Sequence, residues 1–142
     1  MGRRRVWGVL APLVAVGVLA ACQQPTPGVT LQSGSRVVRS SATLYVRDGK
    51  QETGSRSVKA LAVHPGALVN IDVDRSLSKK GWSVHITTGS DNSSTLDSAV
   101  FRGQQHFSFS VGSDNTDVVI SEQGTGSTPA GLWAFTLQPT LQ

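Results

Sequence analysis

Apolar residues along most of this chain occur at every second position, a spacing that favours strands over helices. Three runs of this kind are clear, at 67–73, 82–87 and 106–111. The side chains that we expect to face a core are Val69, Ile71, Val73, Trp82, Val84, Ile86, Phe107, Phe109 and Val111. Only the segment 75–79 suggests a helix, and it is long enough for a single turn. The sequence therefore predicts an all-β fold.

The remaining strands are short, and turn residues separate them. We expect them at 36–39, 42–47, 57–63, 95–101, 118–121 and 132–137. Glycine and proline mark the turns, as in Asp48–Gly49 and Pro65–Gly66. About seven or eight such strands without helices favour an antiparallel immunoglobulin-like β-sandwich, with a small closed barrel as the alternative.

Packing has to stabilise this domain without a disulfide. Cys22 is the only cysteine, so no bond between two cysteines of the chain can form. The 121 residues that follow the leader (142 minus 21) are enough for one domain with one core. Trp82 and Trp133 lie in alternating strands, and we expect both in that core.

The first 22 residues have the parts of an export signal that ends in a cysteine. Arginines at 3–5 precede an apolar stretch at 6–21, which is shorter than the roughly 20 residues of a transmembrane helix. The segment Leu19–Cys22, with two alanines before the cysteine, resembles the lipobox of bacterial lipoproteins. The resemblance implies that residues 1–21 are a signal peptide and that Cys22 carries lipid chains such as palmitate. An uncleaved anchor with an incidental cysteine is the alternative.

Residues 22–35 are expected to form the lipidated cysteine and a flexible tether. Gln, Pro, Gly, Ser and Thr dominate this segment. Such a composition buries too little apolar surface to offset the entropy of ordering the chain. We therefore expect the domain to stay close to the extracytoplasmic face of the cell membrane.

The formal charge of +4 depends largely on the leader, which holds three of the 13 lysines and arginines and none of the nine acidic residues. The rest of the chain is nearly neutral and lacks the persistent basic face that nucleic-acid binding requires. Lys79 and Lys80 form the only adjacent basic pair beyond the leader. A solvated surface and a contact with lipid headgroups both fit this pair.

The three histidines are the first candidates for a metal site. His64, His85 and His106 have no close ligand pair such as HxH, and no second cysteine or further methionine follows the leader. His64 belongs to a turn, and alternation turns His85 and His106 outward. We therefore expect no shared metal site and no other cofactor.

Carboxylates offer two further candidates. Asp72 and Asp74 lie two residues apart, where they could support acid–base chemistry or bind calcium, but solvation or a surface ion pair is favoured. A second possible calcium cluster consists of Asp91, Asp97, Asp114 and Asp117. Turn capping is the favoured interpretation of that group.

Serine catalysis is not indicated. The sequence has no GxSxG motif, and Ser83, Ser108 and Ser110 fit the polar sides of strands. We expect no enzymatic activity.

Several short motifs resemble an uncharacterised family of short actinobacterial lipoproteins, a domain of unknown function. They are Thr43–Tyr45, Val63–Gly66, Val69–Val73, Gly81–Val84 and Gly131–Phe135, together with the lipobox. The resemblance covers most of residues 36–139 and implies a β-rich domain in the cell envelope. It transfers no catalytic residue.

These observations predict a membrane-anchored envelope lipoprotein whose domain is a non-enzymatic binding or scaffold module. The bilayer holds it through acylated Cys22, and its partner is an envelope protein or a cell-wall component. The alternative is a small-ligand or metal-binding lipoprotein. That alternative requires His85 and His106 to converge on one face.

Overall fold

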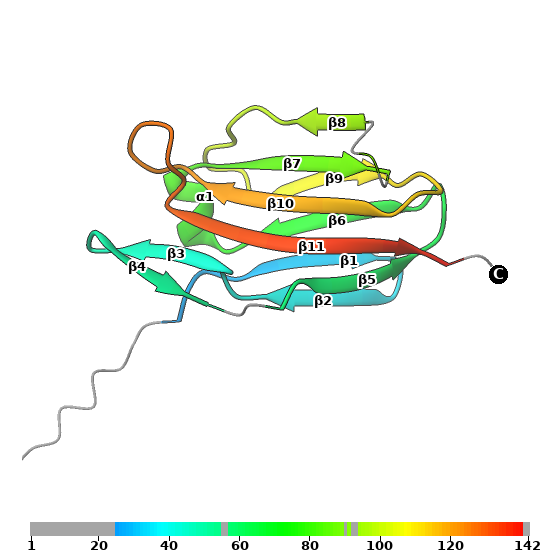
Figure 1. Cartoon of the computed structure of the whole chain (residues 1–142), viewed down its shortest axis with the longest axis horizontal. Coiled ribbons are helices and arrows are strands. Elements are labelled where there is room, and N and C mark those ends of the chain that lie inside the picture. Colours follow the sequence, from blue (N-terminus) through cyan, green and yellow to red (C-terminus); the bar gives the residue numbers. More distant parts are fainter. Residues whose placement is uncertain (1–24, 55–56, 90, 92–93, 141–142) are drawn as a thin grey trace, which may run out of the picture.

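Two β-sheets of four and seven strands pack face to face in the computed structural model, which describes residues 25–54, 57–89, 91 and 94–140 (Figure 1). The strands are β1 (Val29–Ser33), β2 (Arg36–Ser40), β3 (Leu44–Arg47), β4 (Lys50–Thr53), β5 (Lys59–Val63), β6 (Leu68–Val73), β7 (Trp82–Thr88), β8 (Ser94–Asp97), β9 (His106–Ser110), β10 (Thr116–Glu122) and β11 (Gly131–Pro139). One helix, α1 (Arg75–Lys80), joins β6 to β7. The predicted all-β sandwich is confirmed, and because the two sheets are separate, the closed-barrel alternative is wrong.

The small sheet has the strand order β2-β1-β6-β9, and all its pairs are antiparallel. In β1, Val29 and Leu31 are completely buried, while Thr30 and Gln32 at the alternate positions are partly exposed. Leu31 lies opposite Ile71 of β6. The pairing of β1 with β2 on one side and β6 on the other makes β1 an interior strand of this sheet.

The position of β1 corrects the predicted domain boundary. Residues 22–35 were expected to be a tether and residues 36–142 the domain, but the sandwich already includes residues 29–33. Val29 and Leu31 alternate with polar residues, and both side chains are completely buried in the core. The free energy gained by burying them exceeds the entropic cost of ordering this proline- and glycine-containing segment. The tether prediction is therefore wrong for this part of the segment.

The large sheet has the order β4-β3-β11-β10-β7-β8, with β5 as an additional partner of β11. β11 is nine residues long, and two strands share one of its edges. Its start pairs antiparallel with β3 through Gly131 and Tyr45, and its end pairs in parallel with β5 from Phe135 to Pro139. The β5 pair is the one parallel pair among the paired strands that the structure describes.

The core lies between the sheets and consists of the inward-facing residues of both. Trp82 and Trp133 are completely buried, as predicted, and each indole nitrogen donates to a backbone oxygen, of Gln104 at 2.7 Å and Pro27 at 2.9 Å. Of the other residues expected inside, Val69, Ile71, Val73, Val84, Ile86 and Val111 are buried, and Phe107 and Phe109 are partly buried against the core.

The strand count and some boundaries differ from expectation. Eleven strands are present in the described part of the chain, where about seven or eight were predicted. β4 has no apolar residue that could have marked it, since its sequence is KQET. The strand expected at 95–101 is shorter, and Phe101 makes only an isolated bridge to Trp82.

The expected helical turn is present as α1, which ends at Gly81. Gly81 has a φ of 102°, in the region that favours glycine, and its backbone nitrogen donates to Leu77 at 3.1 Å. Leu77 is completely buried and fixes the helix on the core. Within the described ranges, no helix is long and apolar enough to cross a membrane.

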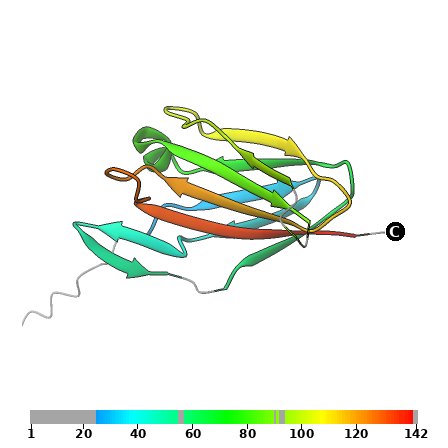
Figure 2. The same cartoon turned by 45° about the horizontal axis from the view of Figure 1, so that its top comes forward.

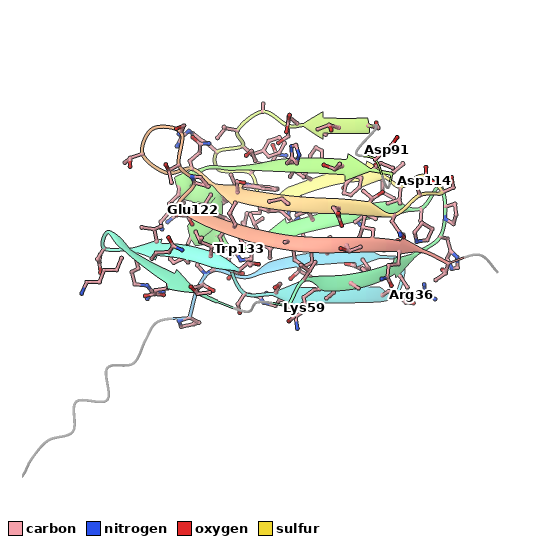
Figure 3. All side chains as sticks on the ribbon, in the orientation of Figure 1. Arg36, Lys59, Asp91, Asp114, Glu122 and Trp133 are labelled. Atoms are coloured by element: carbon pink, nitrogen blue, oxygen red, sulfur yellow. The ribbon has the colours of Figure 1, made fainter. Side chains whose placement is uncertain are left out.

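One end of the sandwich, here called the α1 end, gathers α1, the turn of the β3–β4 hairpin and the loop 123–130 between β10 and β11 (Figure 1). The described chain also begins there, and Figure 2 shows the hairpin projecting from this end. The opposite end, here called the far end, carries Asp91 and Asp114 (Figure 3).

Candidate functional site

The α1 end holds a cluster of a lysine, a glutamate and a tyrosine. The Nζ atom of Lys80, at the end of α1, donates to Oε1 of Glu122 at 3.0 Å and to the hydroxyl of Tyr45 at 2.9 Å. Glu122 ends β10, and Tyr45 lies in β3. Three separate segments of the chain therefore meet at one ammonium group.

Glu122 is at this place because it follows the inward alternation of β10. Val118 and Ile120 precede it on the same face, and both are completely buried. Only 2% of the Glu122 side chain is exposed, and among the described residues its Oε2 atom has no hydrogen-bond partner. A buried charged carboxylate is costly unless it is paired and hydrogen bonded, and Lys80 supplies both the opposite charge and the hydrogen bond.

The pKa of Lys80 depends on two opposing effects, its partial burial and its attraction to Glu122 and Tyr45. Desolvation by burial lowers the pKa of its ammonium, but hydrogen bonds to Tyr45 and Glu122 and electrostatic attraction to both groups raise it. The net result is a pKa above the ordinary lysine value of 10.5. Lys80 therefore carries its positive charge at any physiological pH.

Aromatic packing fixes the tyrosine. The Tyr45 ring meets Trp133 edge-on, with 6.3 Å between the ring centroids. Nζ of Lys80 lies 5.4 Å and Cζ of Arg47 lies 5.7 Å from the centroid of the Tyr45 ring. The Arg47 distance is within the range of cation–π attraction, whereas the ammonium of Lys80, hydrogen bonded to the hydroxyl, lies beyond the rim of the ring. Gly131 permits this packing, because a Cβ atom there would lie 2.7 Å from Trp133 and 2.9 Å from Tyr45.

Two depressions border the cluster. The larger, of about 610 Å³, is lined by Lys80, Glu122, Val46 and Ala130 together with part of the loop 123–130. A smaller one, of about 220 Å³, also borders Glu122 and is lined mainly by serine and glycine residues of β7, β10 and the loop 123–130. The larger depression gives a ligand access to the ammonium of Lys80, whose side chain is 51% exposed.

The chain that follows Cys22 joins the sandwich at this same end. Thr26 accepts a hydrogen bond at its hydroxyl oxygen from the backbone of Ala42 at 3.1 Å. Pro27 accepts the indole hydrogen bond of Trp133. Gly28 donates to Oδ2 of Asp74 at 2.6 Å and accepts from the backbone of Asp74 at 3.1 Å. The fold therefore holds the chain from Thr26 onward.

The histidines that the sequence singled out are not brought together. His85 of β7 hydrogen bonds to Asp97 of β8, on the large sheet, and His106 of β9 hydrogen bonds to Asp72 of β6, on the small sheet. Both histidines are exposed. His64 lies in a turn, with its Nδ1 atom 3.5 Å from the hydroxyl of Thr140. The convergence that a shared histidine site would need is absent.

The carboxylate candidates are not all brought together in the structure. Asp74 forms a surface ion pair with Arg39 at 2.9 Å, and Asp117 accepts a hydrogen bond from Thr136 at 2.8 Å. Over the described ranges, no group of three or more His, Cys, Asp and Glu residues could hold a metal ion. Asp91 and Asp114 lie at the far end, whereas Asp97 pairs with His85 (Figure 3).

Sequence reasoning missed the cluster at the α1 end, although one signal was present. Glu122 occupies an inward position of an alternating strand, where an apolar residue would be expected. The sequence places Lys80 in a basic pair that fits a solvated surface or a contact with lipid headgroups, and nothing in it links this lysine to Tyr45.

Comparison with known proteins adds no assignment. No protein-family model matches this sequence, and no curated protein is significantly similar to it.

Proposed function

We propose that this chain is an envelope lipoprotein, anchored on the extracytoplasmic face of the cell membrane by acylated Cys22, and that its β-sandwich is a non-enzymatic binding or scaffold module. The proposed relatives are the uncharacterised actinobacterial lipoproteins that its motifs resemble. The proposed partner is an envelope protein or a cell-wall component.

The observation that carries the proposal is the short distance in sequence between the lipobox cysteine and the folded domain. Three residues separate Cys22 from Thr26, which is already hydrogen bonded to the sandwich. This chain can span at most about 14 Å. Such an arrangement suits a domain that works close to the bilayer surface.

The metal-binding alternative receives no support from the geometry. It required His85 and His106 to converge, and they lie on different sheets, each beside one aspartate. A binding or scaffold role needs no such convergence, so it remains our proposal.

The experiment is mass spectrometry of the native protein together with membrane fractionation. We expect a mature chain that begins at a diacylglyceryl-modified Cys22 and sediments with membranes. Cys22→Ala should leave the precursor uncleaved or release the chain from the membrane fraction. Ala20→Ser, which keeps a small residue before the cysteine, is the matched control and should behave as the unaltered protein. An intact leader with an unmodified Cys22 would refute the proposal.

A further inference from the structure

The two ends of the sandwich differ in charge. The α1 end has three ion pairs, and the two charges within each pair cancel. The pairs are Arg39 with Asp74, Arg47 with Glu52, and Lys80 with Glu122. The other charged side chains of this end are the exposed Lys50, Arg75, Lys79, Arg102 and Asp48, and Asp72, which hydrogen bonds to His106. Positive charge therefore prevails at the α1 end.

Negative charge prevails at the far end. Figure 3 places Asp91 and Asp114 on the upper side of this end and Arg36 on its lower side. Both aspartates are exposed. The domain is nearly neutral as a whole, but it is electrically polar along its long axis.

The anchor leaves from the positive end. Thr26, Pro27 and Gly28 are held by Ala42, Trp133 and Asp74, which all belong to the α1 end. The chain between Cys22 and Thr26 reaches about 14 Å at most. The nine-residue β11 alone spans about 30 Å along the sandwich. An acylated Cys22 thus keeps the α1 end near the headgroups, whereas the far end can lie well away from them.

We propose that the α1 end docks on anionic phospholipid headgroups and holds the sandwich upright on the bilayer. This inference rests on the proposed acylation of Cys22. In this arrangement, the lipid headgroups are the partner of the α1 end. The far end and the outer faces of the sheets stay accessible to the proposed envelope partner.

The chemistry of the α1 end fits phosphate groups. An ammonium has three N–H donors, and Lys80 uses two of them for Tyr45 and Glu122, so the third can bind a phosphate oxygen beside the larger depression. The carboxylate of Glu122 is buried and does not face the lipid. Around this point, Lys50, Lys79 and Arg102 supply exposed positive charge. Such charges attract an anionic surface within about one Debye length, roughly 8 Å at physiological salt.

The test uses the acylated mature protein, from Cys22 to Gln142, in lipid vesicles. Because acylation consumes the Cys22 thiol, an introduced cysteine is the single reactive thiol for a fluorophore. Ser127→Cys labels the loop of the α1 end, and Ser113→Cys labels the far end; both serines are exposed. With a quencher on the lipid headgroups, we expect strong quenching at position 127 and weak quenching at position 113 in vesicles that contain phosphatidylglycerol.

Charge variants separate docking from simple anchoring. Lys50→Gln, Arg75→Gln and Lys79→Gln combined should shift the docking equilibrium by about five-fold for each charge removed. The matched control, Arg36→Gln with Lys59→Gln, removes charges outside the α1 end and should leave the quenching at position 127 unchanged. In the protein without charge substitutions, added salt should weaken the quenching of the label at position 127. This measurement tests docking even where the triple variant is unstable.

Several outcomes would overturn the inference. They are equal quenching at both labels, equal quenching in vesicles of phosphatidylcholine alone, and, for the same label position in intact cells, crosslinking of position 127 to an envelope protein in place of lipid. Mass spectrometry of the same samples separates the two proposals. An unmodified Cys22 refutes the proposed function and the docking with it, whereas an acylated Cys22 without end-dependent quenching refutes docking alone.

Discussion

The Nζ atom of Lys80 lies 3.0 Å from Oε1 of Glu122, yet the lysine side chain is 51% exposed and the glutamate side chain only 2%. The two partners therefore depend on the pair to different degrees. Without Lys80, a carboxylate would stay buried without its cation. Without the charge of Glu122, the lysine could still be solvated by water.

This asymmetry predicts unequal effects of the two substitutions on the free energy of unfolding. Lys80→Met should lower it by about 2–3 kcal/mol, because the charge of Glu122 remains buried and uncompensated. Glu122→Gln should lower it by only about 1 kcal/mol, since the amide oxygen can still accept from Lys80. Urea denaturation measures both values. Lys79→Met, on an exposed residue of the same helix, is the control and should change the stability by less than about 0.5 kcal/mol. Equal losses for Lys80→Met and Glu122→Gln would contradict the explanation.

The raised pKa of Lys80 predicts an alkaline loss of stability. A group whose pKa is higher in the folded state stabilises that state below its unfolded pKa, here 10.5, and the stabilisation disappears as the pH rises through the folded value. The stability difference between the unaltered protein and Lys80→Met should thus be constant near neutral pH and shrink above about 10.5. Denaturation curves at a series of alkaline pH values measure it. The corresponding difference for Lys79→Met should stay near zero throughout, and a Lys80→Met difference that grows with pH would show that the sign is wrong.

Gly131 predicts a steric effect at the same end. In Gly131→Ala, the new methyl group would lie 2.7 Å from Cη2 of Trp133 and 2.9 Å from Cδ2 of Tyr45, both in a closely packed region. Overpacking of this kind costs about 1–3 kcal/mol. Gly112→Ala is the matched control, because nothing lies within 4 Å of its Cβ position. Thermal melts of the two variants should differ clearly, and tryptophan fluorescence should change only for Gly131→Ala. Equal melting temperatures would show that the ring pair moves aside at no cost.

The sequence predicted the fold class because alternation is a local property that the finished sheets preserve. Val69, Ile71 and Val73 face the core, as their spacing required. The α1 turn was predictable for a similar reason, since Gly81 ends it locally. Alternation does not encode which strands pair, and the parallel pairing of β5 with β11 depends on contacts between residues far apart in the chain.

The cluster at the α1 end could not be predicted for the same physical reason. Lys80, Glu122 and Tyr45 are separated by 35 and 42 residues, and only the packing of α1 against β3 and β10 brings them together. Composition was misleading at the N-terminal boundary of the domain. Proline and glycine near Val29 indicated a tether, whereas two apolar residues at alternate positions were sufficient to add an interior strand.

The corrected boundary gives a further prediction. Leu31 lies in the segment expected to be a tether but is completely buried opposite Ile71, so Leu31→Ala should lower the free energy of unfolding by about 2–5 kcal/mol through lost burial and the cavity left behind. Val37→Ala in the neighbouring β2, where the side chain is 58% exposed, is the control and should cost less than about 0.5 kcal/mol. Urea denaturation of both variants decides between a tether and a strand. If Leu31→Ala were as stable as Val37→Ala, β1 would contribute nothing to the sandwich and the domain would begin after it.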